Sequence, residues 1–572
     1  MDKILYQTDK AANIGNDFLS SFFVVQLNPI LCNGRGSDKF NPTNININDI
    51  LGDYSLTVVD TLDTLAIMGE QELFEDAVNR VLRDVSFNQD NKVQVFESNI
   101  RGLAQDLADR LIPAFQYSKT GLPYPRVNLR HGVPRTETVE TCTAGAGSLV
   151  LEFGVLSRLT NNTYYEDVAK RALNALWNRR SDIDLLGNVI NIQTGQWIHT
   201  ASSTGAGIDS YFEYLLKAYI LFGEPEYLDM FDDAYKAIMQ HVRDPSGYLY
   251  RNVHMSSGAL MATWIDSLSS FWPGVQVLYG DLDSAIKGHL VFYNIWRRYH
   301  GLPERFDYYR KTVDIGFYPL RPEFIESTYY LYRATRDPFY LHVGEMVLED
   351  LNNRTRLPCG FATIGDVRTG RLEDRMESFM LSETLKYLYL LFDTDNAFNK
   401  LDSNFVFTTE GHFLPLAGHL LKKNAPSSSS PSTTATCLPY NIVTTATTSH
   451  PTPHHLDLSS IPYRPETDFA AAIVGYNNNN NEEGGGGRRA SDLLLHPQGH
   501  CVSPHTVAQQ QSFELSFGTD ARTTTANQKF HRQSPKFVDL VGGFLAKSLS
   551  GLKLEITKRP QRTGGGFQVT RG

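Results

Sequence analysis

The chain has little positive charge and no long apolar run. Its 572 residues carry 53 lysines and arginines against 63 aspartates and glutamates, a formal net charge of −10. Proteins that bind nucleic acid through its phosphates present a basic patch, so this balance gives no reason to expect a nucleic-acid partner. No stretch is long and apolar enough to span a bilayer, which predicts that the chain has no transmembrane segment.

Cysteine is scarce, and its spacing excludes the usual zinc motifs. No two of the five cysteines form a CxxC pair or stand at another zinc spacing. An odd number leaves room for one or two disulfides and a free thiol, and the residues alone do not choose among the pairings. The cysteines are Cys32, Cys142, Cys359, Cys437 and Cys501.

Neither end of the given sequence reads as a targeting signal, although a sequence with an incomplete N-terminus would read the same. Asp2, Asp9 and Asp17 interrupt the N-terminal segment, which therefore lacks the apolar stretch of a secretory signal peptide. The C-terminus reads QVTRG, which is not a retrieval signal of the KDEL type. Taken literally, these ends predict a soluble cytosolic protein, whereas the glycosylation tripeptides at Asn161 and Asn353 weakly favour a secretory one.

What the chain does have is a generous stock of core-forming residues. Hydrophobic residues make up 41% and aromatic residues 11% of the sequence, enough for one very large domain or several ordinary ones. Between residues 20 and 422 the apolar residues recur at helical spacing, as in the segments 209–223, 323–335 and 377–392. Strand-like alternation is short, as at 186–192. This block is predicted to be nearly all α, with short hairpins near the loops.

The composition changes at about residue 423. A Ser/Thr/Pro run and later runs of asparagine and glycine cannot bury enough apolar surface to offset chain entropy, so residues 423–530 are predicted to be a low-complexity, disordered linker. Short apolar runs near the end predict a small β element within 531–572. Residues 1–19 are treated as an N-terminal segment without an assigned fold.

Acidic residues recur through the helical block at a nearly constant interval. Successive members stand 55, 57, 57, 57 and 54 residues apart, which fits one helical hairpin per step. Hairpins that close into a ring would direct one carboxylate per step towards a common axis, where acid/base hydrolysis or calcium binding needs them. The members, each predicted in a helical segment, are Glu97, Glu152, Asp209, Asp266, Glu323 and Glu377.

Two local motifs place charges on helix faces. Glu97 and Arg101 are spaced i and i+4, which is typical of an acid tuned by a neighbour but also of an ordinary surface ion pair. Glu323 and Glu326 follow a proline in the first turn of a helix, where the helix dipole favours the ionised form. First-turn acids are favoured at any helix start, yet the adjacent Arg321 makes a functional cluster the better interpretation.

Two further motifs combine polar and aromatic groups. Phe379 and Glu383 are spaced i and i+4, so a ring and a carboxylate share one face, as in many sugar sites and also at the margin of some cores. Thr409 and Glu410 lie in a polar cluster directly after an apolar stretch. A threonine hydroxyl and its backbone carbonyl are good ligands for a hard cation, although a turn without ligands would look the same.

Taken together, these motifs resemble glycoside hydrolase family 47, the class I α-1,2-mannosidases, and within it the ER degradation-enhancing α-mannosidase-like branch. The resemblance covers roughly residues 20–422. The segments that carry it are DYSLTVVDTLDTLAIMG at 53–69, VFESNIRGL at 95–103, ETCTAGAGSLVLEFGVLSRLT at 140–160, GAGIDSYFEYLLKAY at 205–219, SFWPGVQVL at 270–278, LRPEFIESTYYLYRAT at 320–335, DRMESFMLSETLKYLYLLF at 374–392 and FTTEGHFLPL at 407–416.

The resemblance implies an (αα)7 barrel and an inverting, calcium-dependent glycosidase that removes terminal α-1,2-linked mannose from N-glycans. Glu97 matches the family's general acid, Glu323 its general base and Asp209 its third catalytic carboxylate. Thr409 matches the calcium ligand. Residues that match those holding the sugar or the waters around calcium are Arg101, Arg321, Glu326, Phe379, Glu383 and Glu410.

The chain departs from the trimming members at two positions, with Gly207 in place of an arginine and Ser267 in place of a histidine. Both differences are usual in the degradation-enhancing branch, whose activity is weaker or depends on a partner, for which a protein disulfide isomerase type is one expectation. The branch also pairs two cysteines, here Cys32 and Cys359. It implies the lumen of the endoplasmic reticulum, with the N-glycans of misfolded glycoproteins as substrate.

The same predicted site is compatible with two alternative functions. The leading hypothesis is an enzyme that trims mannose and so marks misfolded glycoproteins for degradation. The alternative is a lectin-like receptor that binds mannose-trimmed glycoproteins without turnover. Because the catalytic carboxylates and Thr409 are all present, the enzyme is favoured. A third possibility, an unrelated helical scaffold, does not account for eight matching segments.

Overall fold

The structure is a computed structural model that describes residues 26–35, 56–88, 90, 92–95, 105–422 and 465–476, together with the backbone of five strands after residue 514. The chain forms two compact units. One comprises Met1–Ile461 and Phe469–Tyr476, and the other comprises Pro462–Asp468 and Asn477–Gly572. The predicted functional residues all belong to the first unit.

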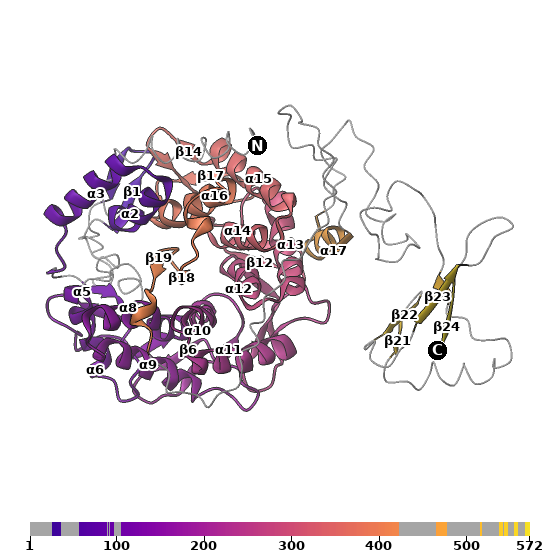
Figure 1. Ribbon diagram of the computed structural model, residues 1–572, viewed down its shortest axis with the longest axis horizontal. Coiled ribbons are helices and arrows are strands. Elements are labelled where there is room, and N and C mark those ends of the chain that lie inside the picture. The colour runs from indigo at the N-terminus through magenta and orange to yellow at the C-terminus, as the bar shows by residue number, and fades with distance from the viewer. Residues whose placement is uncertain are drawn as a thin grey trace. The chain divides into compact units, whose positions relative to one another are not determined.

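The first unit is an α-helical barrel, as predicted, and Figure 1 shows its helices closing into a ring. The ring has (αα)7 architecture, in which inner and outer helices alternate. Its helices are α2 (Leu56–Met68), α3 (Gln71–Asp84), α5 (Gln105–Leu111), α6 (Pro113–Gln116), α7 (Thr143–Gly147), α8 (Val150–Thr160), α9 (Tyr164–Trp177), α10 (Asp209–Phe222), α11 (Pro225–Ala237), α12 (Trp272–Tyr279), α13 (Leu282–Tyr299), α14 (Glu323–Thr335), α15 (Pro338–Arg354) and α16 (Leu385–Phe392).

Short antiparallel strands connect the helices. Most strands precede an inner helix, so each sheet leads the chain to an inner-helix N-terminus. They are β1 (Gln26–Asn28), β2 (Asn33–Arg35), β3 (Lys92–Gln94), β4 (Arg126–Asn128), β5 (Glu140–Cys142), β6 (Val189–Asn191), β7 (Trp197–His199), β8 (Ala201–Ser202), β9 (Asn252–His254), β10 (Leu260–Ala262), β11 (Trp264–Asp266), β12 (Arg305–Asp307), β13 (Thr312–Ile315), β14 (Arg356–Leu357), β15 (Gly360–Phe361), β16 (Thr363–Asp366), β17 (Arg371–Glu373), β18 (Phe405–Phe407) and β19 (Phe413–Pro415).

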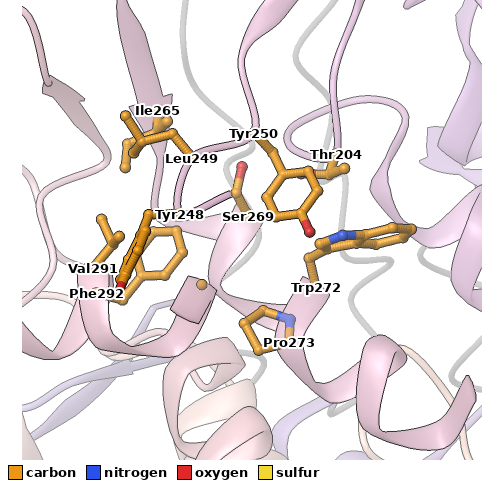
Figure 2. Close-up of a pocket in the computed structure, with 11 residues that line it drawn as sticks. Thr204, Tyr248, Leu249, Tyr250, Ile265, Ser269, Trp272, Pro273, Val291 and Phe292 are labelled. Atoms are coloured by element: carbon orange, nitrogen blue, oxygen red, sulfur yellow. The ribbon is translucent and has the colours of Figure 1, made fainter. Parts of the chain in front are cut away.

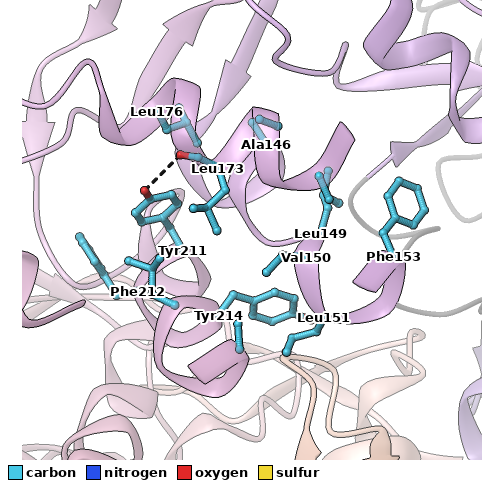
Figure 3. Close-up of a cluster of buried hydrophobic side chains, with 14 of the residues drawn as sticks. Ala146, Leu149, Val150, Leu151, Phe153, Leu173, Leu176, Tyr211, Phe212 and Tyr214 are labelled. Carbon is cyan, nitrogen blue, oxygen red and sulfur yellow. Dashed lines mark hydrogen bonds between the residues drawn. The ribbon is translucent and has the colours of Figure 1, made fainter. Parts of the chain in front are cut away.

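The inner helices are apolar on nearly every side because they contact both their ring neighbours and the outer layer. On α10, for example, Tyr211, Phe212 and Tyr214 are all buried. Figure 3 shows this part of the core, where α7, α8, α9 and α10 meet and the Tyr211 hydroxyl donates to the Leu173 carbonyl over 3.3 Å. α7 lies so near α10 that a Cβ on Gly147 would come within 2.2 Å of the Tyr211 ring.

The predicted helices match the structure where capping signals frame them. α10 and α14 begin at the predicted acids, and Gly223 ends α10 with a left-handed φ of 69°. One prediction was wrong, because Asp266 ends strand β11 rather than lying in a helix. The segment predicted to be helical from 377 does begin its hydrogen-bonded turns there, since the Glu377 carbonyl accepts from the Met380 N–H, but it passes through a π-helical turn (Met380–Thr384) before α16. Short helical turns also occur at Ile238–Val242, Leu268–Phe271, Phe398–Lys400 and Gly418–Leu420.

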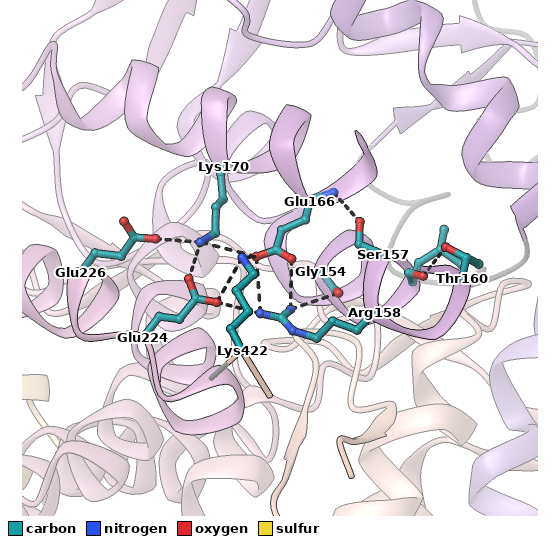
Figure 4. A network of polar contacts seen from close by, with 10 residues as sticks. Gly154, Ser157, Arg158, Thr160, Glu166, Lys170, Glu224, Glu226 and Lys422 are labelled. Carbon is teal, nitrogen blue, oxygen red and sulfur yellow. Dashed lines mark hydrogen bonds and ion pairs between the residues drawn. The ribbon is translucent and has the colours of Figure 1, made fainter. Parts of the chain in front are cut away.

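Two features tie remote parts of the barrel together. The structure contains the Cys32–Cys359 disulfide that the resemblance implied, linking residues 327 apart in sequence. On the outside, a cluster of ion pairs gathers the ends of α8, α9 and the α10–α11 connection (Figure 4). Lys422, at the end of the barrel segment, joins this cluster through Glu166 at 2.7 Å. The other members are Arg158, Lys170, Glu224 and Glu226.

A further helix, α17 (Pro465–Val474), contributes its residues from Phe469 onward to the first unit. Ala470 and Val474 are fully buried in the core that includes α13. The Nζ of Lys311 donates to the Ala472 carbonyl at 2.8 Å, and an Nη of Arg298 donates to the Val474 carbonyl at 2.6 Å. These cations satisfy carbonyls that the helix C-terminus leaves without intrahelical partners.

Apart from the first residues of α17, the described residues of the second unit all lie in strands. β21 (Phe537–Leu540) pairs with β22 (Gly543–Ala546), and β23 (Leu554–Lys558) pairs with β24 (Phe567–Arg571), which also pairs with β20 (Leu515–Ser516). Two of these strands lie where short apolar runs predicted them. The proposed domain boundaries, including that of the linker 423–530, stay predictions. Among the described residues, no helix combines the length and apolar composition needed to cross a membrane.

Candidate active site

Two of the three predicted catalytic carboxylates occupy the same place in repeats that are separated by one other repeat. Asp209 is the first residue of α10 and Glu323 is the first residue of α14, each on an inner helix that follows a β segment. At this position the partial positive charge of the helix N-terminus acts on the carboxylate. The repeated connection from strand to inner helix therefore collects acids at one end of the barrel.

Asp209 stands among other acids. Its Oδ1 accepts a hydrogen bond of 2.8 Å from the backbone N–H of Ser210. Burial and the nearby carboxylates of Asp266 and Glu213 raise the pKa of Asp209 to about 7, against the lowering effects of the Ser210 N–H and the Arg321 guanidinium. At neutral pH this carboxyl therefore holds a proton part of the time.

Glu323 shares Arg321 with a neighbouring acid. Arg321 donates to both oxygens of Glu304, at 2.5 and 3.2 Å, and an Nη of Arg321 lies 3.9 Å from Oε1 of Glu323. The Oε2 of Glu323 has no hydrogen-bond partner among the described residues. Burial, with Glu304 and Glu326 nearby, raises the pKa of Glu323 to about 8, although Arg321 lowers it. The free oxygen is where a water molecule would be held.

Behind this layer lies a second group of buried acids. Glu326, on the same helix face as Glu323, contacts Lys217 at 3.6 Å and accepts from the Tyr387 hydroxyl at 3.5 Å. Burial raises its pKa to about 8 despite the Lys217 charge. Burial also raises the pKa of Glu383 well above its ordinary value, and the carboxylates of Glu410, Glu323 and Glu326 add to that effect. The site thus gathers several buried carboxyl groups whose ionised forms are disfavoured.

The hairpin β18–β19 brings Thr409 and Glu410 to this acid group, and Figure 1 shows the hairpin in the middle of the ring. Glu410 is buried, and its charge acts on Glu383 as described above. Thr409 is half-buried, and its N–H donates to the Tyr214 hydroxyl over 3.4 Å. The predicted calcium ligand and four of the predicted sugar- or water-holding residues therefore share one site.

This donor set fits calcium. A hard cation binds oxygen ligands, and Thr409 offers a hydroxyl and a carbonyl oxygen. The acids beside it are buried, and burial disfavours their ionised forms unless a positive charge is near. Among the described residues, no three His, Cys, Asp or Glu side chains are grouped to hold a metal ion.

Phe379 also lies beside the site, since the Arg321 guanidinium is 5.8 Å from the centre of its ring. The predicted helical relation between Phe379 and Glu383 is altered, because the chain between them enters the π-helical turn. Glu97 and Arg101 lie outside the described residues, so their places in the site remain predictions.

Several residues of the site escaped the sequence analysis. Glu304 gave no local signal, because only the fold brings it to Arg321. Glu213 and Lys217 form a buried i, i+4 ion pair on α10, and that spacing was visible in the sequence. Glu152 and Asp266 were recognised only as members of the acidic series. Asp266 proves to be held by Ser269 and by the Ala206 N–H at 3.3 Å.

The two positions that the sequence analysis singled out as departures, Gly207 and Ser267, lie close in sequence to acids of the site. Gly207 has φ of +86°, and a Cβ there would lie 2.6 Å from the Asn188 Oδ1, so a larger residue would require this segment to move. Ser267 is buried directly after Asp266. Gly207 therefore contributes only backbone, two residues before Asp209.

One cavity lies near but apart from the carboxylates. It is lined mainly by apolar and aromatic side chains between β11, α12 and α13, among them Tyr250, Trp272 and Phe292 (Figure 2). Its volume of about 10 Å³ holds roughly one water molecule. It is a gap in core packing and not a substrate site.

Acids gathered at the inner-helix N-termini of an α-helical barrel supply the groups that acid/base hydrolysis of a glycosidic bond needs. The sequence model of glycosyl hydrolase family 47 matches residues 31–105 and 102–416. The chain belongs to this family, as the motifs predicted.

Curated relatives agree with this assignment. The chain is 46% identical over 420 residues to ER degradation-enhancing alpha-mannosidase-like protein 1 of Schizosaccharomyces pombe, covering 68% of this chain and 53% of the relative. It is 44% identical over 444 residues to the human ER degradation-enhancing alpha-mannosidase-like protein 3, covering 70% and 47%. It is 45% identical over 415 residues to Alpha-mannosidase I MNS4 of Arabidopsis thaliana, covering 66% of each. The chain thus spans about half the length of the first two.

A solved structure supports the fold. The alpha-1,2-mannosidase from Trichoderma reesei superposes with a TM-score of 0.62 at 24% identity, covering 73% of this chain and 98% of the other.

Proposed function

We propose that the protein hydrolyses terminal α-1,2-linked mannose from high-mannose N-glycans of misfolded glycoproteins in the lumen of the endoplasmic reticulum. The reaction is inverting and calcium-dependent, and it promotes the degradation of these glycoproteins. The observation that carries the proposal is the pair Asp209 and Glu323, which stand at inner-helix N-termini with raised pKa values of about 7 and 8. Family membership and the mannosidase names of the relatives support the choice of sugar.

Inversion requires a base that activates water on one side of the sugar and an acid that protonates the leaving oxygen on the other. Such carboxyl groups stand about 6.5–9.5 Å apart in inverting enzymes. Glu323 suits the base, since its Oε2 is free to accept from water. Glu97 is the proposed acid, and Asp209, which is partly protonated at neutral pH, holds a proton near the departing oxygen.

The remaining residues bind and orient. Arg321, fixed by Glu304, keeps positive charge beside Glu323 and so favours its ionised form. Phe379 and Arg321 present an aromatic and a cationic group to the sugar. Thr409 would hold calcium, with Glu326, Glu383 and Glu410 holding its waters. Bound there, the ion would supply positive charge and coordination for sugar hydroxyls.

The lectin-like receptor remains the second candidate, and Gly207 is the observation that favours it. Glycine offers no side chain that could act on the scissile bond, at the position where the sequence analysis expects an arginine in trimming members of the family. A site without that group would suit a protein that retains trimmed glycans.

The deciding experiment uses the purified full chain, with its disulfide formed, and a high-mannose glycoprotein whose glycans are read by mass. The wild type should release hexose units, and both a calcium chelator and Glu323→Gln should reduce the release by at least 100-fold. Glu166→Gln, which alters a buried glutamate in the outer ion cluster, is the matched control and should retain activity. Glycan binding without any loss of hexose would support the receptor instead.

A further inference from the structure

The turn that presents Thr409 is held by the protein itself. Within the turn, the Thr408 N–H donates to the His412 carbonyl and the Gly411 N–H donates to the Thr408 carbonyl, both at 2.9 Å. The His412 N–H also donates to the Thr408 hydroxyl at 3.2 Å. These bonds close the tip of the β18–β19 hairpin but do not fix its position in the barrel.

A lysine and an aspartate fix one side of the turn. The Lys386 ammonium, which is fully buried on α16, donates to both oxygens of Asp63 at 2.9 Å and to the Gly411 carbonyl at 2.7 Å. Its three hydrogens therefore all have acceptors. Asp63, on α2, also accepts the Phe413 N–H at 2.8 Å. One ion pair thus binds the backbone two and four residues after Thr409.

A tyrosine and a glutamate fix the other side. The Tyr214 hydroxyl on α10 accepts the Thr409 N–H and donates to Oε1 of Glu152 on α8 at 2.5 Å. Both side chains are buried. Because the hydroxyl and the carboxyl are both shielded from water, this hydrogen bond is costly to break, and it sets the direction in which the Tyr214 hydroxyl donates.

Packing leaves the turn little freedom. Gly411 adopts a left-handed φ of +67°, and a Cβ there would lie 2.9 Å from Cγ of Glu383. The turn therefore rests directly against one of the acids of the site, and only glycine fits both the conformation and the contact.

We infer that Lys386–Asp63 and Tyr214–Glu152 form a two-sided clamp that sets the Thr409 oxygens in place before any cation binds. Lys386, Asp63, Tyr214 and Glu152 are thus positioning residues, contributed by α16, α2, α10 and α8. This inference rests on the proposed calcium site at Thr409. Preorganised ligands bind a cation more tightly because the cost of ordering them is met during folding.

The test combines two measurements on the full chain. The first is calcium affinity by titration calorimetry, comparing the wild type with Lys386→Met, Asp63→Asn and Tyr214→Phe. Loss of an outer partner of a metal ligand typically weakens binding by about 10–100-fold, and we expect each variant to fall in this range. Lys170→Met, which removes a lysine from the outer ion cluster, is the matched control and should bind as the wild type does.

The second measurement is hydrogen exchange of the Thr409 and Phe413 amides in chelator. Both amides should be protected in the calcium-free wild type. The Phe413 amide should exchange at least tenfold faster in Asp63→Asn than in the wild type, and the Thr409 amide should do so in Tyr214→Phe. Tyr214→Phe is nearly isosteric and keeps the test valid where Lys386→Met fails to fold. Protection that appears only with calcium, or wild-type affinity in these variants, would overturn the clamp. A wild type that binds no calcium but protects both amides would instead refute only the calcium part of the proposed function.

Discussion

The charge state of Glu152 makes a quantitative prediction. This glutamate is 1% exposed on α8, and burial raises its pKa to about 7 from an ordinary 4.5, although the Tyr214 hydrogen bond and the His412 charge lower it. Between these two values the folded protein binds more protons than the unfolded chain does. Folding stability therefore falls as the pH rises through this window, and below about 4.5 the contribution is fully present.

The substitution Glu152→Gln removes the titration and keeps an oxygen for Tyr214 to donate to. A shift from 4.5 to about 7 implies that the variant gains about 2 kcal/mol relative to the wild type between pH 5.5 and 8.5, at about 1.4 kcal/mol per pKa unit. The assay is urea unfolding in chelator at both pH values, followed by tryptophan fluorescence. The quantity compared is the difference in unfolding free energy between the two proteins.

Glu166 provides the matched control, since it is an equally buried glutamate on the neighbouring helix α9. It contacts Arg158, Lys170 and Lys422 at 3.4, 3.4 and 2.7 Å, so Glu166→Gln breaks a cationic network and should cost stability at both pH values. A Glu152→Gln difference that stays the same at pH 5.5 and 8.5 would refute the reasoning, because it would mean that Glu152 is ionised in the folded protein throughout.

Two further predictions concern structure outside the site. Ala470→Glu places a charge in the fully buried face of α17 and should release that helix, so hydrogen exchange of residues 469–476 should become at least tenfold faster. The control Ala472→Glu places the charge on the exposed face and should leave the exchange unchanged. Equal protection in both variants would contradict the packing of α17 against the barrel. Cys359→Ser removes the disulfide to Cys32 and should lower the free energy of unfolding by about 2–5 kcal/mol, measured by urea unfolding of the variant and the wild type without reductant. In reductant, where the wild type also lacks the disulfide, the two proteins should unfold with the same free energy.

The parts of the fold that the sequence predicted correctly are those with local signals at both ends. α10 and α14 each begin at an acid and show helical periodicity, and α10 also ends in a glycine that adopts the left-handed conformation. The residues of the acidic series are similar in spacing but not in structure. Asp266 stands on a strand because the repeat length counts connections as well as helices, and spacing alone cannot separate the two.

The residues that support the site could not be predicted from local sequence patterns. Lys386 and Asp63 are 323 residues apart and meet only because the last inner helix closes the ring against the first. Glu304 and Arg321 are 17 apart, but a β segment folds between them. The residues predicted to bind the sugar belong to motifs that can be identified in the sequence. The residues that hold them in place need only a complementary polar partner, and many residue types can be that partner, so the sequence does not single them out.

The number of buried carboxyl groups in the site indicates the kind of ligand that the site binds. Burial raises the pKa values of Asp209, Glu323, Glu326 and Glu383. The described cations near them are already shared with other acids, Arg321 with Glu304, Lys217 with Glu213 and Lys386 with Asp63. A fold selected only for stability would replace such groups with apolar ones, since unneutralised buried carboxylates oppose folding. Under the proposed function, positive charge held at Thr409 would lower those pKa values. Glu323 would then be ionised and could act as a base at neutral pH.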